Sequence, residues 1–353
     1  MRLVIAAMVG CSSHALQPDA TSTDVATDVA IDAAQPLDIS ATAGKDEDPA
    51  LLRLADGSIQ LAWFSERTGA GDIYYRRSPD GISWDAPVQV SSGPSTDVYP
   101  SVAEQPAGTL HAVWQRFDAD PNTSSRIIYN RSTDGTWSAA GEQTIASGID
   151  WSPALAVTAS GALVVVFAHD PCAPSLPVCF ELEVVRSLDG GATWSPPSAP
   201  ALGAGGYSDT LPFLARTGDH LTLVWNRYVA STAAELPYQT PTSEVMLATT
   251  ADGVTWSAPI AVTSNADYDV FPALFEDQAG AWQITWLTAP AATQVSTAVV
   301  QPVATAGAGA PDGTLPVTGY SPRAIATTVP DRYIAAWVEG TSDVDIWAQP
   351  FSR

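Results

Sequence analysis

Residues Ser187-Leu188-Asp189-Gly190-Gly191-Ala192-Thr193-Trp194 form a turn motif that recurs along the chain. In such a motif Asp and Ser accept hydrogen bonds from turn amides, Gly takes a positive φ, and Trp packs against the adjoining sheet. Shorter copies run from Ser78 to Trp84, from Ser132 to Trp137 and from Thr250 to Trp256. The residues expected to have this purely structural role are Ser78, Asp80, Gly81, Trp84, Ser132, Asp134, Gly135, Trp137, Ser187, Asp189, Gly191, Trp194, Asp252, Gly253 and Trp256.

A longer repeat surrounds these turns. It consists of an acidic residue, a proline opening an apolar strand, a Gly-containing turn, and a second strand that ends in an aromatic residue. The prolines, about 50 to 60 residues apart, are Pro49, Pro100, Pro153, Pro212, Pro272 and Pro322. The aromatic residues are Trp63, Trp114, Phe167, Trp225, Trp286 and Trp337. Because two independent markers keep the same step, the sequence predicts six repeated units.

Each unit holds about four short β segments, in the first unit residues 49–54, 58–64, 72–77 and 87–90. A lone small sheet cannot bury both faces, so such units are expected to stack around an axis. The last unit ends after three strands, whereas Gln35 to Ser40 resembles the fourth-strand segments of other units. The prediction is an all-β, six-bladed β-propeller of four-stranded antiparallel blades, closed by an N-terminal strand that completes the last blade.

The turn motif resembles the S-x-D-x-G-x-T-W pattern of Asp-box repeats, also called bacterial neuraminidase (BNR) repeats. Four copies in step with the strand repeats, over about residues 36–351, make the chain similar to the sialidase-like (neuraminidase) superfamily. The resemblance implies a propeller. It does not imply one activity, because that superfamily includes enzymes and pure binding proteins.

The N-terminus is typical of an export signal, with Arg2 before a short apolar run. Residues 8–11 resemble a bacterial lipobox, which implies lipidation of Cys11; an ordinary secretory signal is the alternative. Residues 1–11 are therefore interpreted as a signal peptide with lipobox, 12–35 as a flexible acidic tether, and 36–353 as the propeller. This predicts an exported protein, either an outer-membrane or cell-surface lipoprotein of a bacterium or a secreted one. Only the N-terminal lipid would contact the membrane.

The net charge of the chain limits its possible partners. The net charge of −23 makes nucleic acid an unlikely ligand, since its recognition needs clustered Lys and Arg.

In an oxidising compartment, Cys172 and Cys179 in a Pro-rich segment predict a local disulfide. Residues 118–122 alternate oxygen ligands, but the Gly and Glu of a calcium loop are missing. The sequence predicts no metal and no cofactor.

A binding site is expected at the end of the ring opposite the Asp boxes, where the loops that enter the first strands and leave the second strands converge. The candidate ligand-binding residues are Asp97, Tyr99, Arg116, Asp150, Trp151, Tyr207, Asp209, Arg227, Asp269, Tyr320 and Arg323. Aromatic rings can stack on the C–H surfaces of sugars, and the guanidinium group of Arg can bind their carboxylate or hydroxyl groups. An acidic residue repeated at one point of each unit would also serve as a strand-entry cap, and this alternative stays open.

Two functions follow as hypotheses. The first is binding of an extracellular glycan or envelope protein at that face. The second is a divergent exo-sialidase or another glycoside hydrolase acting on external sugars. The sialidase resemblance implies three arginines, for which Arg116, Arg227 and Arg323 are candidates, and a nucleophile at Tyr320 or Tyr268. The Phe/Tyr-Arg-Ile-Pro motif of that family is absent from this sequence. A structural scaffold without a small ligand is a third possibility.

Overall fold

The computed structural model describes residues 36–40, 44–172, 179–202, 207–229, 243–290, 295–307, 310–340 and 344–352. The predicted signal peptide, Cys11 and the tether lie outside these residues. Within the described ranges, no helix is long and apolar enough to cross a membrane.

Short antiparallel strands form most of the described chain. The first two sheets are β2 (Asp46–Arg53), β3 (Ile59–Ser65), β4 (Asp72–Ser78) and β5 (Val88–Gln89), then β6 (Thr96–Glu104), β7 (Leu110–Phe117), β8 (Ser125–Ser132) and β9 (Gln143–Gly148). The third sheet is β10 (Asp150–Val157), β11 (Leu163–His169) and β12 (Glu181–Ser187). Its fourth position is reduced to one bridge between Val184 and Ser198, so this unit lacks the predicted fourth strand.

The next sheet has eight strands. It contains the meander β13 (Tyr207–Thr217), β14 (His220–Val229), β15 (Ser243–Thr250) and β16 (Ile260–Ala261), and the meander β17 (Tyr268–Glu276), β18 (Trp282–Ala289), β19 (Thr297–Pro302) and β20 (Gly313–Thr314). One parallel bridge between Ser243 and Tyr268 joins the two meanders. Strand pairing therefore yields five sheets in the described chain, because two of the predicted units share this contact.

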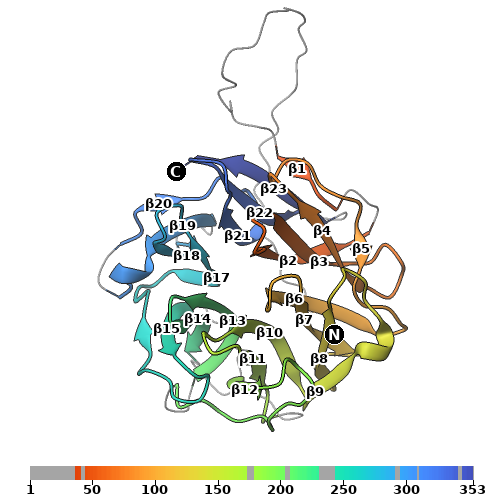
Figure 1. Cartoon of the computed structure of the whole chain (residues 1–353). Coiled ribbons are helices and arrows are strands. Elements are labelled where there is room, and N and C mark those ends of the chain that lie inside the picture. Colours follow the sequence, from red (N-terminus) through yellow and green to blue (C-terminus); the bar gives the residue numbers. More distant parts are fainter. Residues whose placement is uncertain are drawn as a thin grey trace, which may run out of the picture.

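The last sheet joins the two ends of the propeller. It comprises β21 (Tyr320–Ala326), β22 (Tyr333–Glu339), β23 (Asp345–Phe351) and β1 (Leu37–Asp38). Leu37 pairs with Ala348, and the Ile39 amide donates to the Ile346 carbonyl at 2.7 Å. β1 and β23 lie side by side in Figure 1. The N-terminal strand thus occupies the outer edge that β23 would otherwise expose.

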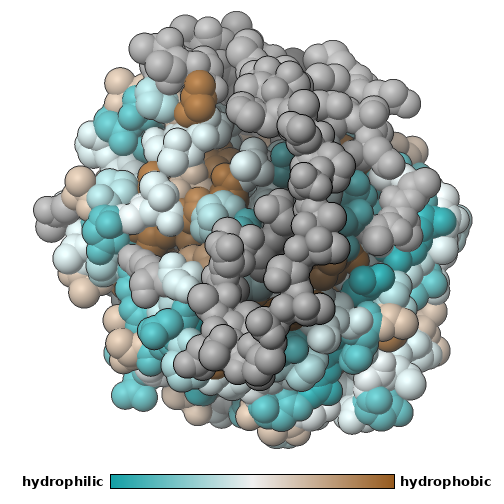
Figure 2. Space-filling model, turned by 90° about the horizontal axis from the view of Figure 1, so that it is seen from above, coloured by the Kyte–Doolittle hydropathy of each residue, from teal (hydrophilic) through white to brown (hydrophobic). Residues whose placement is uncertain are grey.

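The sheets surround a common axis, with β2, β6, β10, β13, β17 and β21 nearest to it, and the protein is an all-β propeller (Figure 1). The core lies between neighbouring sheets. The repeated aromatic residues of the second strands are at most 2% exposed. On the side shown in Figure 2, hydrophobic residues of the described surface form only small groups between hydrophilic ones.

The repeated prolines lie within the inner strands, whereas the sequence predicted that they open them. β2 begins at Asp46, three residues before Pro49, and β6 begins at Thr96, four residues before Pro100. In every inner strand the register shifts at the X-Pro step, as between Glu47 and Ala50. Each proline therefore belongs to a β-bulge, a place where proline is tolerated because a ladder bond is already broken.

Candidate functional site: the narrow end of the central channel

The residue before each of these prolines has a left-handed backbone. These residues are Asp48, Tyr99, Ser152, Leu211, Phe271 and Ser321, with φ between 49° and 57°. A proline disfavours helical backbone at the preceding position, and a positive φ is uncommon outside glycine. Such strained residues concentrate at functional sites. Here the strain recurs in each inner strand and turns six side chains toward the axis.

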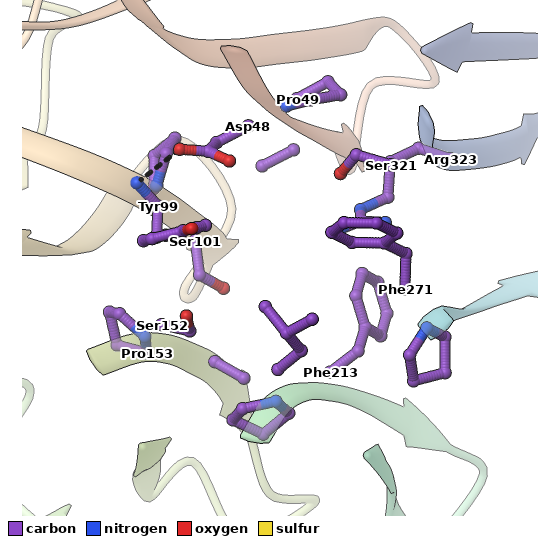
Figure 3. A pocket seen from close by; sticks show the side chains of 16 residues that line it. Asp48, Pro49, Tyr99, Ser101, Ser152, Pro153, Phe213, Phe271, Ser321 and Arg323 are labelled. Atoms are coloured by element: carbon purple, nitrogen blue, oxygen red, sulfur yellow. Dashed lines mark hydrogen bonds between the residues drawn. The ribbon is translucent and has the colours of Figure 1, made fainter. Parts of the chain in front are cut away.

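These six residues line one small cavity at the narrow end of the channel (Figure 3). It measures about 60 Å³, enough for a few water molecules. Tyr99, Ser101 and Ser152 lie on one side of it, and Phe213, Phe271 and Arg323 on the other. The cavity thus combines hydroxyl groups, aromatic rings and one cation.

Asp48 is the acid of this cavity. Its Oδ2 accepts a 3.2 Å hydrogen bond from the Tyr99 amide. Burial, followed by the charge of Glu47, raises the pKa of Asp48 to about 7, although Tyr99, Lys45 and Arg323 act in the opposite direction. A carboxyl group with this pKa can gain and lose a proton at neutral pH, as general acids and bases do.

Glu47 lies beside Asp48 and binds a phenol from the last sheet. The Tyr320 hydroxyl donates to Glu47 Oε1 at 2.7 Å, and Lys45 Nζ contacts Oε2 at 2.5 Å. Burial and the Glu47 charge raise the pKa of Tyr320, so its phenol stays protonated. This arrangement holds a donor and an acceptor in a fixed mutual orientation.

Two further tyrosines belong to the same end of the channel. The Tyr228 and Tyr268 rings lie 6.4 Å apart. Burial raises the pKa of both phenols, and Tyr99 adds a smaller electrostatic effect on Tyr228. Tyr99 acts in the same way on Tyr320. Tyr99 and Tyr320 contact the acids Asp48 and Glu47, and Tyr228 and Tyr268 lie next to each other at the same end of the channel. We call these six residues the channel mouth.

Most of the candidate arginines and aspartates pair within their own sheets. Arg116 Nε and Nη2 each donate to Asp97 at 2.6 Å, and Arg116 Nη1 donates to Glu142 at 2.5 Å. Arg227 forms the equivalent two bonds with Asp209, at 2.8 and 2.7 Å. These arginines are bound to carboxylates at the ends of two separate sheets.

The other repeated acids have similar partners. His169 Nδ1 lies 2.7 Å from Asp150 Oδ1, and Trp286 Nε1 donates to Asp269 at 3.1 Å. Asp150 has a pKa of about 6, raised by burial against the opposing effect of His169. These contacts give both acids partners within their own sheets.

Of the candidate binding residues, the structure brings Tyr99, Tyr320 and Arg323 to the axis. Trp151 packs on Phe180 with ring centroids 5.6 Å apart, and the Tyr207 side chain lies outside the described part of the chain. Glu47, Phe213 and Tyr228 were not among the residues predicted for the site. The position before each repeated proline is the sequence signal that marks the ring of residues including Asp48 and Phe271.

The repeated turn motifs lie at the opposite end, since strands three and four connect there. Asp189 Oδ1 accepts from the Thr193 amide at 2.9 Å, and Ser187 Oγ accepts from the Gly191 amide at 2.8 Å. The same contacts recur around Asp80 and Asp252. Trp84, Trp137, Trp194 and Trp256 pack on the cores between sheets. All of these residues have structural contacts.

Cys172 and Cys179 form a disulfide with their Cα atoms 5.8 Å apart. Residues 173–178 between them lie outside the described chain. Asp170 Oδ1 accepts from the Cys172 amide at 3.0 Å, which links the disulfide to the end of β11.

Comparisons with solved structures establish the fold. No known protein family matches the sequence, and no curated protein matches it. The α-L-arabinanase of Penicillium chrysogenum is 14% identical, with a TM-score of 0.67 over 90% of this chain and 99% of that one. The α-L-arabinofuranosidase Arb93A of Fusarium graminearum is 13% identical, with a TM-score of 0.66 over 91% and 98%.

A third similar structure is the K499G mutant of the NanB sialidase of Streptococcus pneumoniae. It is 11% identical, with a TM-score of 0.61 over 90% of this chain and 70% of that one. The protein therefore has a sialidase-like propeller fold, which these sugar-cleaving enzymes share. At such identities the likeness concerns the fold.

The Asp48 carboxyl makes stability depend on pH. Its pKa is about 3.8 in the unfolded chain and about 7 in the fold, so the native state binds this proton more tightly. The stabilisation from the protonated form is complete below about pH 4 and is lost as the pH rises through 7. The free energy of unfolding of Asp48→Asn, relative to that of the wild type, should therefore increase by about 1–3 kcal/mol as the pH rises from 4 to 8. Urea unfolding of both proteins measures this; a difference that stays constant with pH would contradict it.

Proposed function

We propose that the protein is an exported glycan-acting propeller that binds an extracellular sugar chain at the channel mouth. The supporting observation is the contact of Tyr99 with Asp48 and of Tyr320 with Glu47, at the end of the channel where the Tyr228 and Tyr268 rings also lie. Phenol rings stack on the C–H faces of sugars, while carboxylates accept bonds from sugar hydroxyls. An envelope protein that presents such groups is the other partner that this surface suits.

Counted by their inner strands, the sheets correspond to six blades, with the two meanders of the eight-stranded sheet as separate blades. We propose that the turn motifs are Asp boxes of the superfamily that the sequence resembles. Cys11 would carry the lipid and residues 12–35 would form the tether. The mass of the N-terminal peptide of the mature protein tests this anchor, which requires a lipid-modified Cys11.

Hydrolysis is a second candidate, favoured by the contact between Tyr320 and Glu47 beside an acid with a pKa of about 7. In such a reaction the Glu47 carboxylate would accept the Tyr320 proton as the phenol oxygen attacks the sugar. Asp48 would donate its proton to the leaving oxygen as the glycosidic bond breaks. The Asp48 carboxylate would then take a proton from the water that displaces the sugar from Tyr320, and Glu47 would return its proton to the phenol oxygen. Arg116 and Arg227 would have no part, since both bind carboxylates in their own sheets.

One experiment addresses both candidates. A glycan array probed with the purified protein should give saturable binding, and Tyr99→Ala should weaken it about tenfold or more through loss of a stacking face. Leu188→Ala, 77% exposed at the opposite end, is the control and should bind normally. Fluorogenic sialosides and arabinosides test turnover, which Glu47→Gln would reduce by at least about 100-fold. Binding unaffected by Tyr99→Ala would contradict the proposed site.

A further inference from the structure

The wide half of the central channel opens at the end opposite the mouth. This second cavity measures about 630 Å³ and is lined by the later parts of the inner strands. It meets the small cavity at the narrow end of the channel, since both cavities are lined by Ala50, Ser101, Phe213 and Arg323. The two cavities therefore follow one another along the axis; we call the larger one the lower chamber.

Apolar side chains form most of the lower chamber. Those that are partly exposed include Leu52, Trp282 and Ile325, whereas Leu155, Leu214 and Phe275 lie behind them in the cores between sheets. Its size and apolar lining are those of sites that bind small molecules, which span about 300–1,000 Å³ and hold a few polar groups for orientation. Hydroxyl-rich sugars gain little from such walls. The chamber therefore suits a ligand with a hydrocarbon body.

The inner end of the chamber carries a cation, Arg323, for which the described part of the chain provides no salt bridge. The Arg323 guanidinium donates to the Pro322 carbonyl at 2.9 Å and stacks over the Phe213 ring at 5.4 Å. Among the described residues, no acid forms a salt bridge with it, in contrast to Arg116 and Arg227. Asp48, which lines the same small cavity, acts on Arg323 electrostatically, but the pKa of Asp48 is raised to about 7, so this carboxyl group is only partly charged at neutral pH. Burial lowers the pKa of Arg323 to about 10, so it remains charged at neutral pH. A buried charge is costly unless it is paired.

Other charges of the chamber lie nearer its rim. Arg53, Arg216 and Glu276 are exposed, so water solvates them. Glu104 accepts from the Ala55 amide at 2.5 Å and from the Gly108 amide at 2.6 Å, which occupies its carboxylate. The chamber thus has an apolar wall and one inner charge that a ligand anion would complement.

We propose that the lower chamber binds a small amphipathic carboxylate, with its anionic head on Arg323 and its hydrocarbon body along the apolar wall. The guanidinium presents its remaining N–H donors in a fork that matches a carboxylate. This site goes beyond the proposed glycan site, because it opens at the other end of the channel and shares only Ala50, Ser101, Phe213 and Arg323 with the small cavity at the narrow end.

Calorimetric titration with octanoate tests the proposal. The full-length protein should bind octanoate saturably, and Arg323→Gln should weaken that binding about tenfold or more, the effect of losing a charge-assisted bond. Arg126→Gln removes an arginine that is 28% exposed and bonded to Asp118, and should leave octanoate binding unchanged. 1-Octanol, which lacks the charge, should bind weakly and equally to wild type and Arg323→Gln.

A second variant keeps the test independent of Arg323. Ala215→Phe adds a ring inside the chamber and should reduce octanoate binding at least tenfold while leaving sugar binding at the mouth intact. The proposal is overturned if folded wild-type protein shows no saturable octanoate binding, or if Arg323→Gln or Ala215→Phe binds octanoate as tightly as wild type. Loss of sugar binding alone would contradict only the proposed glycan site.

Discussion

Replacing Arg116 by alanine is expected to lower the free energy of unfolding by about 3–5 kcal/mol. The substitution leaves two acids without their cation, and the side chains of Asp97 and Glu142 are only 1% and 11% exposed. Removing one partner of a buried ion pair is costly because the remaining charge is desolvated and unpaired. Urea denaturation of the purified variant measures the loss.

Arg126→Ala is the matched control. Arg126 binds Asp118 through two 3.0 Å contacts, but Asp118 is 66% exposed and stays solvated without its partner. Its removal should cost about 0–1 kcal/mol. Equal effects of the two variants would show that burial of the Arg116 cluster does not determine its contribution. Direct binding of a ligand by Arg116 predicts instead a loss of affinity with little change in stability.

Gly191→Ala should destabilise the fold by about 3–5 kcal/mol. Gly191 has φ +88°, and a Cβ there would lie within 2.5 Å of three atoms of the Tyr129 side chain. Tyr129 is fully buried and packs on Trp194 at 5.0 Å between ring centroids, so it cannot move aside. Thermal and urea unfolding should both show the loss.

Gly108→Ala separates the backbone strain from the steric clash, the two causes of the loss expected for Gly191→Ala. Gly108 has nearly the same φ, +84°, but a Cβ there meets no atom within 4 Å. It should cost only the backbone strain, about 1–2 kcal/mol. The excess at Gly191 then measures the clash with Tyr129. If both variants lost the same stability, close packing of the turn against the neighbouring sheet would not contribute to the free energy of unfolding.

Local patterns were enough to predict the propeller, the strand order within its units and the closing strand. The aromatic residues at the ends of the second strands repeat because each fills the same gap between sheets, and sequence spacing reports that gap. The shared contact between Ser243 and Tyr268 and the missing fourth strand after Glu181–Ser187 had no such signal. These two features depend on the conformation of the loops between neighbouring sheets, and the loops differ in length from unit to unit.

The site was less predictable, because proximity around the axis depends on backbone conformation. The repeated acids and arginines stood out in the sequence, yet Asp97 and Asp209 bind arginines of their own sheets. The left-handed residue before each proline turns Asp48 and Tyr99 inward, and no propensity rule predicts that conformation ahead of proline. The Tyr320–Glu47 contact spans 273 residues and required the closed ring.

Pairing of β1 with β23 means that the propeller closes only after its last sheet has formed. Ser40 accepts a hydrogen bond from the Ile346 amide, 306 residues further along the chain. A chain emerging from the ribosome carries this strand without its partner until β23 has been synthesised. The contacts between the first and last units, Tyr320 with Glu47 among them, can form only after that step, so a truncated product would lack an assembled mouth.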